Sequence, residues 1–108
     1  MYEAESKAGY VYVLYDSSNP RLLKIGRTKR HPHTRKRELE IHHKIKWIIY
    51  AIHWFHDCEK AERVIHKLIR SSGCVYRSEL YNYDAALANQ VILSINQAME
   101  STNLVPRR

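Results

Sequence analysis

Tyr10–Tyr15 reads YVYVLY, and Leu22–Gly26 reads LLKIG. The first run is rich in β-branched and aromatic residues, which favour strands, and the second is a short apolar run. Between them, Asp16–Pro20 is a cluster of turn-forming residues. The two runs are therefore expected to pair as an antiparallel hairpin with a longer loop between the strands.

The segment after the hairpin predicts a helix and then a third strand. Pro32 is of a type common in first helical turns, and Thr34–Ile41 continues from it as a mostly polar helix. This helix is expected to bury Leu39, with Ile41 as the second candidate. Lys46–Phe55 is rich in Ile, Trp and Tyr and predicts the third strand.

The second half of the chain predicts two more helices. Asp57 is expected to cap the first of them, and Gly73 is expected to end it. Its apolar residues recur at helical spacing: Ala61, Val64, Ile65, Leu68 and Ile69. Glu79–Tyr81 is a candidate short strand, and Asn82 is the expected cap of the last helix. The apolar side of that helix would carry Ala86, Leu87, Val91, Ile92, Ile95 and Met99.

The predicted fold is of the α/β (α+β) class, with the element order β-β-α-β-α-(β)-α. It contains a small three-stranded antiparallel sheet flanked by helices. The chain has 108 residues, of which 44% are hydrophobic and 27% are charged, a balance typical of one globular domain. We expect a single domain over residues 1–108, with its core at about 9–100 and a flexible tail at 101–108.

The charge of the chain points to a polyanionic partner. Lys and Arg total 18 against 11 acidic residues, which gives a formal net charge of +7. Such a molecule attracts polyanions, so nucleic acid is the expected partner. Composition alone leaves open the alternative that the excess of basic residues serves only solubility.

Other sequence features bound the location of the protein. The longest apolar run, Trp47–Phe55, is interrupted by His53 and is shorter than a bilayer span of ~18 residues, so a membrane protein is not expected. The first ten residues, MYEAESKAGY, lack a basic start followed by an apolar stretch, so no secretion signal is expected. Cys58 and Cys74 lie far apart and form no C-x-x-C motif, which is typical of a reducing compartment. An intracellular location, cytoplasm or nucleus, is therefore expected.

Four short motifs form a larger pattern when they are taken together. They are GYVYVL at Gly9–Leu14, LKIGRT at Leu23–Thr28, Arg35 with Glu38 and Leu39, and Ala61-Glu62 followed by Ile65-His66. In this order and spacing they resemble the GIY-YIG nuclease superfamily, and they are most similar to its branch named for phage T5 open reading frame 172, described as a DNA-binding domain. The resemblance covers about Gly9 to Tyr81. It implies the same three-stranded fold and a Mg²⁺- or Mn²⁺-dependent cleavage of phosphodiester bonds.

The resemblance assigns catalytic roles to three residues. Tyr12 stands at the first tyrosine of the family and would help to deprotonate water. Arg35 stands where the family places an arginine on the scissile phosphate. Glu62 stands at the metal-ligand position, where one carboxylate holds Mg²⁺ with water and phosphate. Without the motif, these residues would be a strand aromatic, part of a solvated charge run, and a surface pair with His66 worth ~0.3–0.5 kcal/mol.

Lys24 is the main departure from the family pattern, because the chain has lysine where the YIG motif has tyrosine. A lysine at this position would stabilise the transition state by its charge or assist ionisation of Tyr12. The same change is also typical of a domain that binds without cutting. Gly26 is expected where the backbone turns sharply or approaches the substrate closely.

Further residues are expected to bind the substrate rather than to react. They are Gly26, Arg27, Lys29, Arg30, Lys36, Arg37 and His66. The basic members of this set would hold the phosphates of a polyanion, although such a run is often only a solvated surface. Glu79–Tyr81 resembles the ending of the same branch, where it would form the far wall of the site.

Three functional hypotheses follow from the sequence. The first is a metal-dependent endonuclease, a hydrolase that acts on nucleic acid, DNA in preference to RNA. The second is a catalytically silent nucleic-acid-binding module of the same fold, and the third is an interaction protein with incidental charge. The first predicts that Tyr12, Lys24, Arg35 and Glu62 converge on one concave surface. The oligomeric state is left open.

Overall fold

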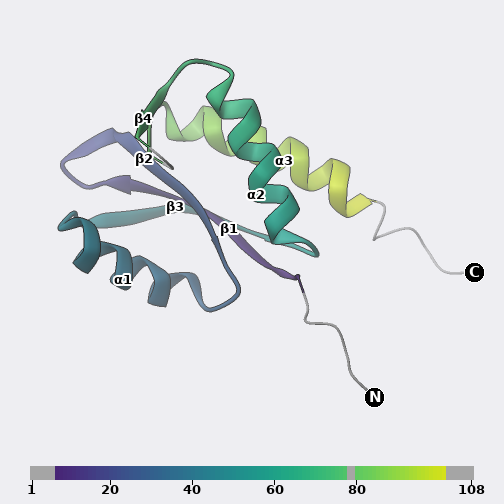
Figure 1. The fold of residues 1–108 in the computed structure, drawn as a ribbon, viewed down its shortest axis with the longest axis horizontal. Coiled ribbons are helices and arrows are strands. Elements are labelled where there is room, and N and C mark those ends of the chain that lie inside the picture. The colour runs from purple at the N-terminus through teal and green to yellow at the C-terminus, as the bar shows by residue number, and fades with distance from the viewer. Residues whose placement is uncertain (1–6, 78–79, 102–108) are drawn as a thin grey trace, which may run out of the picture.

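The computed structural model describes residues 7–77 and 80–101. In this part of the chain, five strands form one antiparallel sheet and three helices pack on it (Figure 1). The elements are β1 (Gly9–Asp16), β2 (Asn19–Thr28), α1 (Pro32–His43), β3 (Trp47–Phe55), α2 (Cys58–Arg70), β4 (Val75–Arg77), β5 (Leu80–Asn82) and α3 (Ala85–Ser101). The strand order across the sheet is β3-β1-β2-β5-β4.

The α+β class and the three long strands are confirmed, but the predicted three-stranded sheet was wrong in number. Two strands of three residues, β4 and β5, extend it beyond β2. Every residue of β4 is exposed, so no alternation of polar and apolar residues marks it in the sequence. Glu79, which belonged to the predicted short strand, lies outside the described residues.

The β1–β2 hairpin is tighter than predicted. β1 ends at Asp16 and β2 begins at Asn19, and these two residues are cross-strand partners. The Asp16 carboxylate accepts a hydrogen bond from the backbone N–H of Ser18 at 2.9 Å. An aspartate that bonds two residues ahead closes a turn within the hairpin itself, so the longer loop expected at Asp16–Pro20 is replaced by paired strand.

The last helix begins later than predicted. Asn82 is the final residue of β5, paired with Leu22 of β2, and so does not cap the helix. Asp84 caps it instead, because its Oδ1 accepts from the backbone N–H groups of Ala86 at 2.8 Å and Leu87 at 3.2 Å. At the other end α3 includes Ser101, which had been assigned to the tail. The rest of that tail, 102–108, lies outside the described residues.

The helices lie on opposite faces of the sheet (Figure 1). α2 and α3 cover one face, where the larger core contains Val11, Val13, Leu23, Ile25, Ile65 and Ile92, among others. α1 lies on the other face, over a smaller core of Tyr12, Leu14, Leu39 and Trp47. Alternate residues of β1 therefore enter different cores, as the period of a strand requires.

Some helix positions differ from the expected burial. Leu39 is buried as predicted, but Ile41 is 76% exposed, because α1 covers its face of the sheet with little more than Leu39 and Pro32. Leu68 and Leu87 are also exposed, since each lies at the border of its helix's apolar side. Among the described residues, no helix combines the length and apolar character that crossing a membrane requires.

Candidate functional site

Tyr12 and Gly26 are direct cross-strand partners in β1 and β2. The side chain of Tyr12 is 2% exposed, and its ring lies over Gly26. A Cβ atom at position 26 would stand only 2.5 Å from the Tyr12 hydroxyl oxygen. Gly26 lies within a regular strand, so the expected sharp turn is wrong. The close approach is real, but in the structure the approaching group is the Tyr12 phenol.

Arg35 extends from α1 to this phenol. Burial opposes the charge of its guanidinium, but its interactions with the Tyr12 side chain and with Glu38 outweigh that effect and raise the pKa of Arg35. The guanidinium is therefore a permanent cation beside the Tyr12 hydroxyl.

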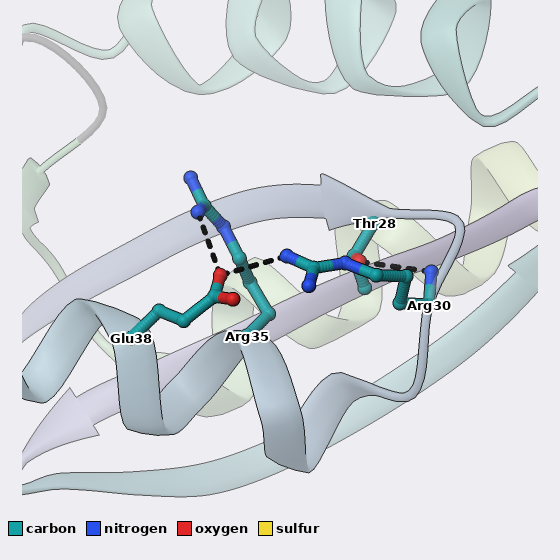
Figure 2. A network of polar contacts seen from close by, with 4 residues as sticks. All are labelled: Thr28, Arg30, Arg35 and Glu38. Atoms are coloured by element: carbon teal, nitrogen blue, oxygen red, sulfur yellow. Dashed lines mark hydrogen bonds and ion pairs between the residues drawn. The ribbon is translucent and has the colours of Figure 1, made fainter.

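Glu38 links Arg35 to Arg30, as Figure 2 shows. Its Oε1 accepts from Arg30 at 2.7 Å and from Arg35 at 3.3 Å. The contact with Arg30 is the main reason that the pKa of Glu38 lies below its ordinary value. The backbone N–H of Arg30 donates to Thr28 Oγ1 at 3.0 Å, which fixes the start of the loop. One carboxylate is shared between two guanidinium groups, so the cluster keeps a net positive charge.

Lys24 lies on the same face of the sheet as Tyr12, two residues before Gly26 in β2. It is 7% exposed, and its cross-strand partners are Leu14 in β1 and Leu80 in β5. Its charge also contributes, after burial itself, to the lowered pKa of His43 on α1. Tyr12, Lys24 and Arg35 thus belong to one group on the α1 face of the sheet.

Glu62 belongs to a second group, on the α2 face. Its Oε1 lies 3.1 Å from Arg27 Nε, and its Oε2 lies 3.4 Å from His66 Nε2. The other ring nitrogen of His66 is hydrogen-bonded to the hydroxyl of Tyr81, which is fully buried in the larger core. A polar chain therefore runs from the exposed Arg27 through Glu62 and His66 to Tyr81. The sequence had indicated Tyr81 only as a wall of the site.

The expected convergence of all four catalytic candidates on one concave surface was wrong. Consecutive strand residues point to opposite faces, so Gly26 lies under the Tyr12 ring while Arg27 turns to Glu62 on the other side. Both groups include a residue of β2, Gly26 in the first and Arg27 in the second. Strand β5 pairs with β2 only over Leu22–Lys24, so in the described part of the chain residues 25–28 have no strand on that side.

The remaining basic candidates lie along the β2–α1 connection and on α1. Lys29 and Arg37 are exposed, and the Lys36 amine forms an ion pair with Glu40 at 3.0 Å. Arg27 and Arg30 keep 40% and 59% of their side chains exposed, so their ion pairs leave N–H groups accessible to a ligand.

Few protein atoms near Glu62 could serve as ligands for a cation. The described residues contain no group of three or more His, Cys, Asp or Glu side chains arranged to hold a metal. Glu62 alone offers the hard oxygen that Mg²⁺ prefers, and one protein carboxylate with waters and a substrate phosphate is a common shell. Its Oε1 is engaged by Arg27, so a cation fits only where Arg27 moves away.

Comparison with protein families gives a match to the model of the T5orf172 domain over residues 9–96. This span includes both polar groups and the open edge of β2. Among curated proteins and solved structures, nothing matches the chain.

Proposed function

Because the chain belongs to the T5orf172 domain family, which indicates a nucleic-acid-binding or nuclease-like module, we propose that it binds nucleic acid and hydrolyses a phosphodiester bond at the open edge of β2. DNA is the preferred substrate over RNA, and Mg²⁺ or Mn²⁺ is the cofactor, as in the GIY-YIG nucleases. The observation that carries the proposal is the Tyr12 phenol, laid over Gly26 with the Arg35 guanidinium beside it.

Arg35 and Arg30 would bind the phosphate oxygens. A guanidinium fork offers two parallel N–H donors to a phosphate and keeps its charge at any relevant pH. Arg35 lies beside the Tyr12 hydroxyl and Lys24 lies on the same face, so both cations stand on the side of the sheet where Tyr12 would act as the general base. Tyr12 is then the group that accepts a proton from the attacking water, and Lys24 and Arg35 stabilise the charge that develops on the phosphate.

Glu62 is the residue that would hold the cation, after Arg27 has moved from Oε1 to a phosphate of the substrate. When bound, the metal would neutralise phosphate charge and polarise a water molecule. His66 holds the second oxygen of Glu62 and is itself fixed by Tyr81, so the carboxylate keeps its orientation when Arg27 leaves.

A second candidate function is the catalytically silent nucleic-acid-binding module. Three observations favour it: Glu62 lies on the opposite face of the sheet from Tyr12, both oxygens of Glu62 have protein partners, and Lys24 replaces the second tyrosine of the family pattern. In this case the same arginines bind phosphate, but no cation displaces Arg27. The intracellular location expected from the sequence stays a prediction under either function.

A nicking assay with a matched pair of variants tests the proposal. Supercoiled DNA, flapped DNA and structured RNA are incubated with the parent protein in Mg²⁺, in Mn²⁺ and in EDTA. Glu62→Gln is expected to abolish cleavage while binding in EDTA is unchanged, because the amide keeps the shape but loses the charge that holds the cation. Glu59→Gln, on the same helix, is the control and should cut like the parent.

The outcomes separate the two functions. If the parent binds these substrates but cuts none of them with either metal, the silent module replaces the nuclease. If Glu62→Gln cuts at the parental rate, Glu62 is not the metal ligand.

A further inference from the structure

α1 covers only part of its face of the sheet. The covered part is the smaller core, where Leu39 packs with Leu14 and Trp47. Beyond this core, Trp54 of β3 is 44% exposed and Ile52 is 37% exposed, both large apolar side chains in solvent. Figure 1 shows α1 over one end of the sheet only, away from the start of β1.

The strand register places these exposed side chains in line with the candidate site. Trp54 is the cross-strand partner of Tyr10, and Ile52 is the partner of Tyr12. Directly opposed residues of an antiparallel pair point to the same face, so all four lie on the α1 face. We name Tyr10, Ile52 and Trp54 the stacking platform. The stacking platform lies next to the cross-strand pair Tyr12–Gly26, in which the Tyr12 ring lies over Gly26.

From β2 across β1 to β3, the side chains on this surface change from basic to aromatic. At β2 and the loop after it lie Thr28 and Arg30, with Arg35 above, and at β3 lies the indole of Trp54. Neighbouring strands are ~4.8 Å apart, so Trp54 lies about 10 Å from β2. Proteins bind unpaired nucleic-acid strands with cationic side chains that contact the phosphates and with exposed aromatic side chains on which the bases stack.

The indole is held in place before any ligand arrives. The His56 ring packs edge-on against Trp54 with the ring centroids 4.5 Å apart, and His56 is in turn hydrogen-bonded to Glu100 of α3. The backbone carbonyl of Trp54 accepts from Asn96 Nδ2 at 2.9 Å. A fixed aromatic surface loses little entropy when a base stacks on it.

We propose that the stacking platform binds unpaired bases of the strand whose phosphate lies at Tyr12 and Arg35, so that the substrate class is single-stranded or flapped nucleic acid. This inference rests on the proposed nucleic-acid binding and specifies its substrate. A base in a duplex is stacked between its neighbours and has no free face for Trp54, whereas an unpaired base has one.

A second copy of the chain is the competing occupant, because β3 is an edge strand with exposed apolar residues. Two observations favour the polyanion. The carbonyl of Trp54, which strand addition at this end of β3 would use, is already bonded to Asn96. Each copy also carries a formal charge of +7, which opposes self-association and favours nucleic acid.

The test compares affinities for an unpaired and a paired ligand of equal length. Trp54→Ala and the control Leu68→Ala, an exposed position on α2, are titrated with a labelled oligothymidylate and with a blunt duplex at one salt concentration. Trp54→Ala should weaken single-strand binding roughly 5- to 150-fold and duplex binding by less than about twofold, as loss of one base stack requires. Leu68→Ala should change neither affinity, and Trp54→Tyr should restore most of the loss.

Fluorescence gives a second readout that does not depend on affinity. The chain has two tryptophans, and Trp47 is 1% exposed in the smaller core, so quenching by a bound base reports Trp54. Oligothymidylate should quench the parent and leave Trp54→Tyr unquenched at saturation. Thermal melting of each variant verifies that it is folded.

Several results would overturn the inference. Equal losses of single-strand and duplex affinity in Trp54→Ala, or tight binding of the oligonucleotide without quenching, would remove the stacking platform and leave nucleic-acid binding standing. A dimer that Trp54→Ala converts to a monomer, with single-strand affinity unchanged, would assign the surface to a second copy. A parent protein that binds neither ligand would contradict the proposed function itself.

Discussion

At the scale of single residues, Gly26 and Tyr12 depend on each other. The absence of a side chain at position 26 is what allows the phenol to lie across β2, and the phenol in turn fills the space above the strand. The position of the hydroxyl beside Arg35 therefore follows from a packing requirement between two strands. The placement of the Tyr12 hydroxyl and the packing of β1 on β2 therefore depend on the same pair of residues.

Gly26→Ala is expected to destabilise the protein by about 1–3 kcal/mol, the usual cost of forcing extra atoms into packed space. The new Cβ would stand 2.5 Å from the hydroxyl oxygen and 2.8 Å from Cζ of Tyr12. In a Tyr12→Leu background, where both atoms are absent, the same substitution should cost little. Urea unfolding of the parent, the two single variants and the double variant gives the coupling energy. An equal cost in both backgrounds would mean that the Tyr12 ring does not occupy this space.

At the scale of elements, α1 is docked by polar contacts more than by apolar burial. Only Pro32 and Leu39 of the helix are buried. Glu40 Oε2 accepts from the backbone N–H of Trp47 at the start of β3 and from the Lys36 amine, both at 3.0 Å. Because α1 carries Arg35, this tie between α1 and β3 also helps to position the guanidinium over the sheet.

Acid should therefore loosen α1 through Glu40. Its ion pair with Lys36, together with the N–H of Trp47, lowers the pKa of Glu40 below its ordinary value. A lowered pKa in the folded protein means that the stabilisation is fully present above the ordinary pKa of about 4.3 and is lost as pH falls through the folded value. Glu40→Gln should be less stable than the parent at pH 7, and the difference in stability should shrink as the pH falls below the ordinary pKa of a glutamate. Urea titrations across this pH range measure the difference, and a difference that does not change with pH would exclude Glu40.

The elements that were predicted from sequence carry local signals, and those that were missed depend on distant partners. The aromatic and β-branched residues of β1 and the helical spacing of Ala61–Ile69 can be recognised without knowing the rest of the fold. Asn82 and Asp84 are both good capping residues, and the pairing of β5 with β2 decides between them. Such a choice cannot be made from the neighbouring residues alone.

The candidate site also has features that local sequence predicts and features that depend on distant partners. The motif positions could be found from the sequence, and the structure places Tyr12 and Arg35 together as expected. The pairing of Glu62 with Arg27 could not be predicted, because it depends on where α2 lies across the opposite face of the sheet. The alternation of Gly26 and Arg27 along β2 does follow from strand geometry, and it is what separates the two polar groups.

At the scale of the whole molecule, basic side chains are concentrated where the phosphate contacts are proposed. The segment 27–37, from the end of β2 into α1, contains a third of the 18 Lys and Arg residues of the chain: Arg27, Lys29, Arg30, Arg35, Lys36 and Arg37. Their acidic partners are Glu38, Glu40 and Glu62, so these six basic residues still outnumber the carboxylates that pair with them. The field of this segment would orient a polyanion toward the β2 edge before contact is made.

This distribution predicts a position-dependent salt effect on binding. Each phosphate contact releases counterions, so the logarithm of the affinity for a single strand falls with the logarithm of the salt concentration by about 0.7 per contact. Lys29→Gln and Arg30→Gln, in the loop after β2, should each lower the slope by about that amount. Lys67→Gln, exposed near the end of α2, removes the same charge without a proposed contact and should leave the slope unchanged. Titrations of a labelled oligonucleotide at four or more salt concentrations measure all three. If Lys67→Gln lowers the salt slope as much as Lys29→Gln and Arg30→Gln do, only the net charge of +7 attracts nucleic acid and there is no defined set of phosphate contacts.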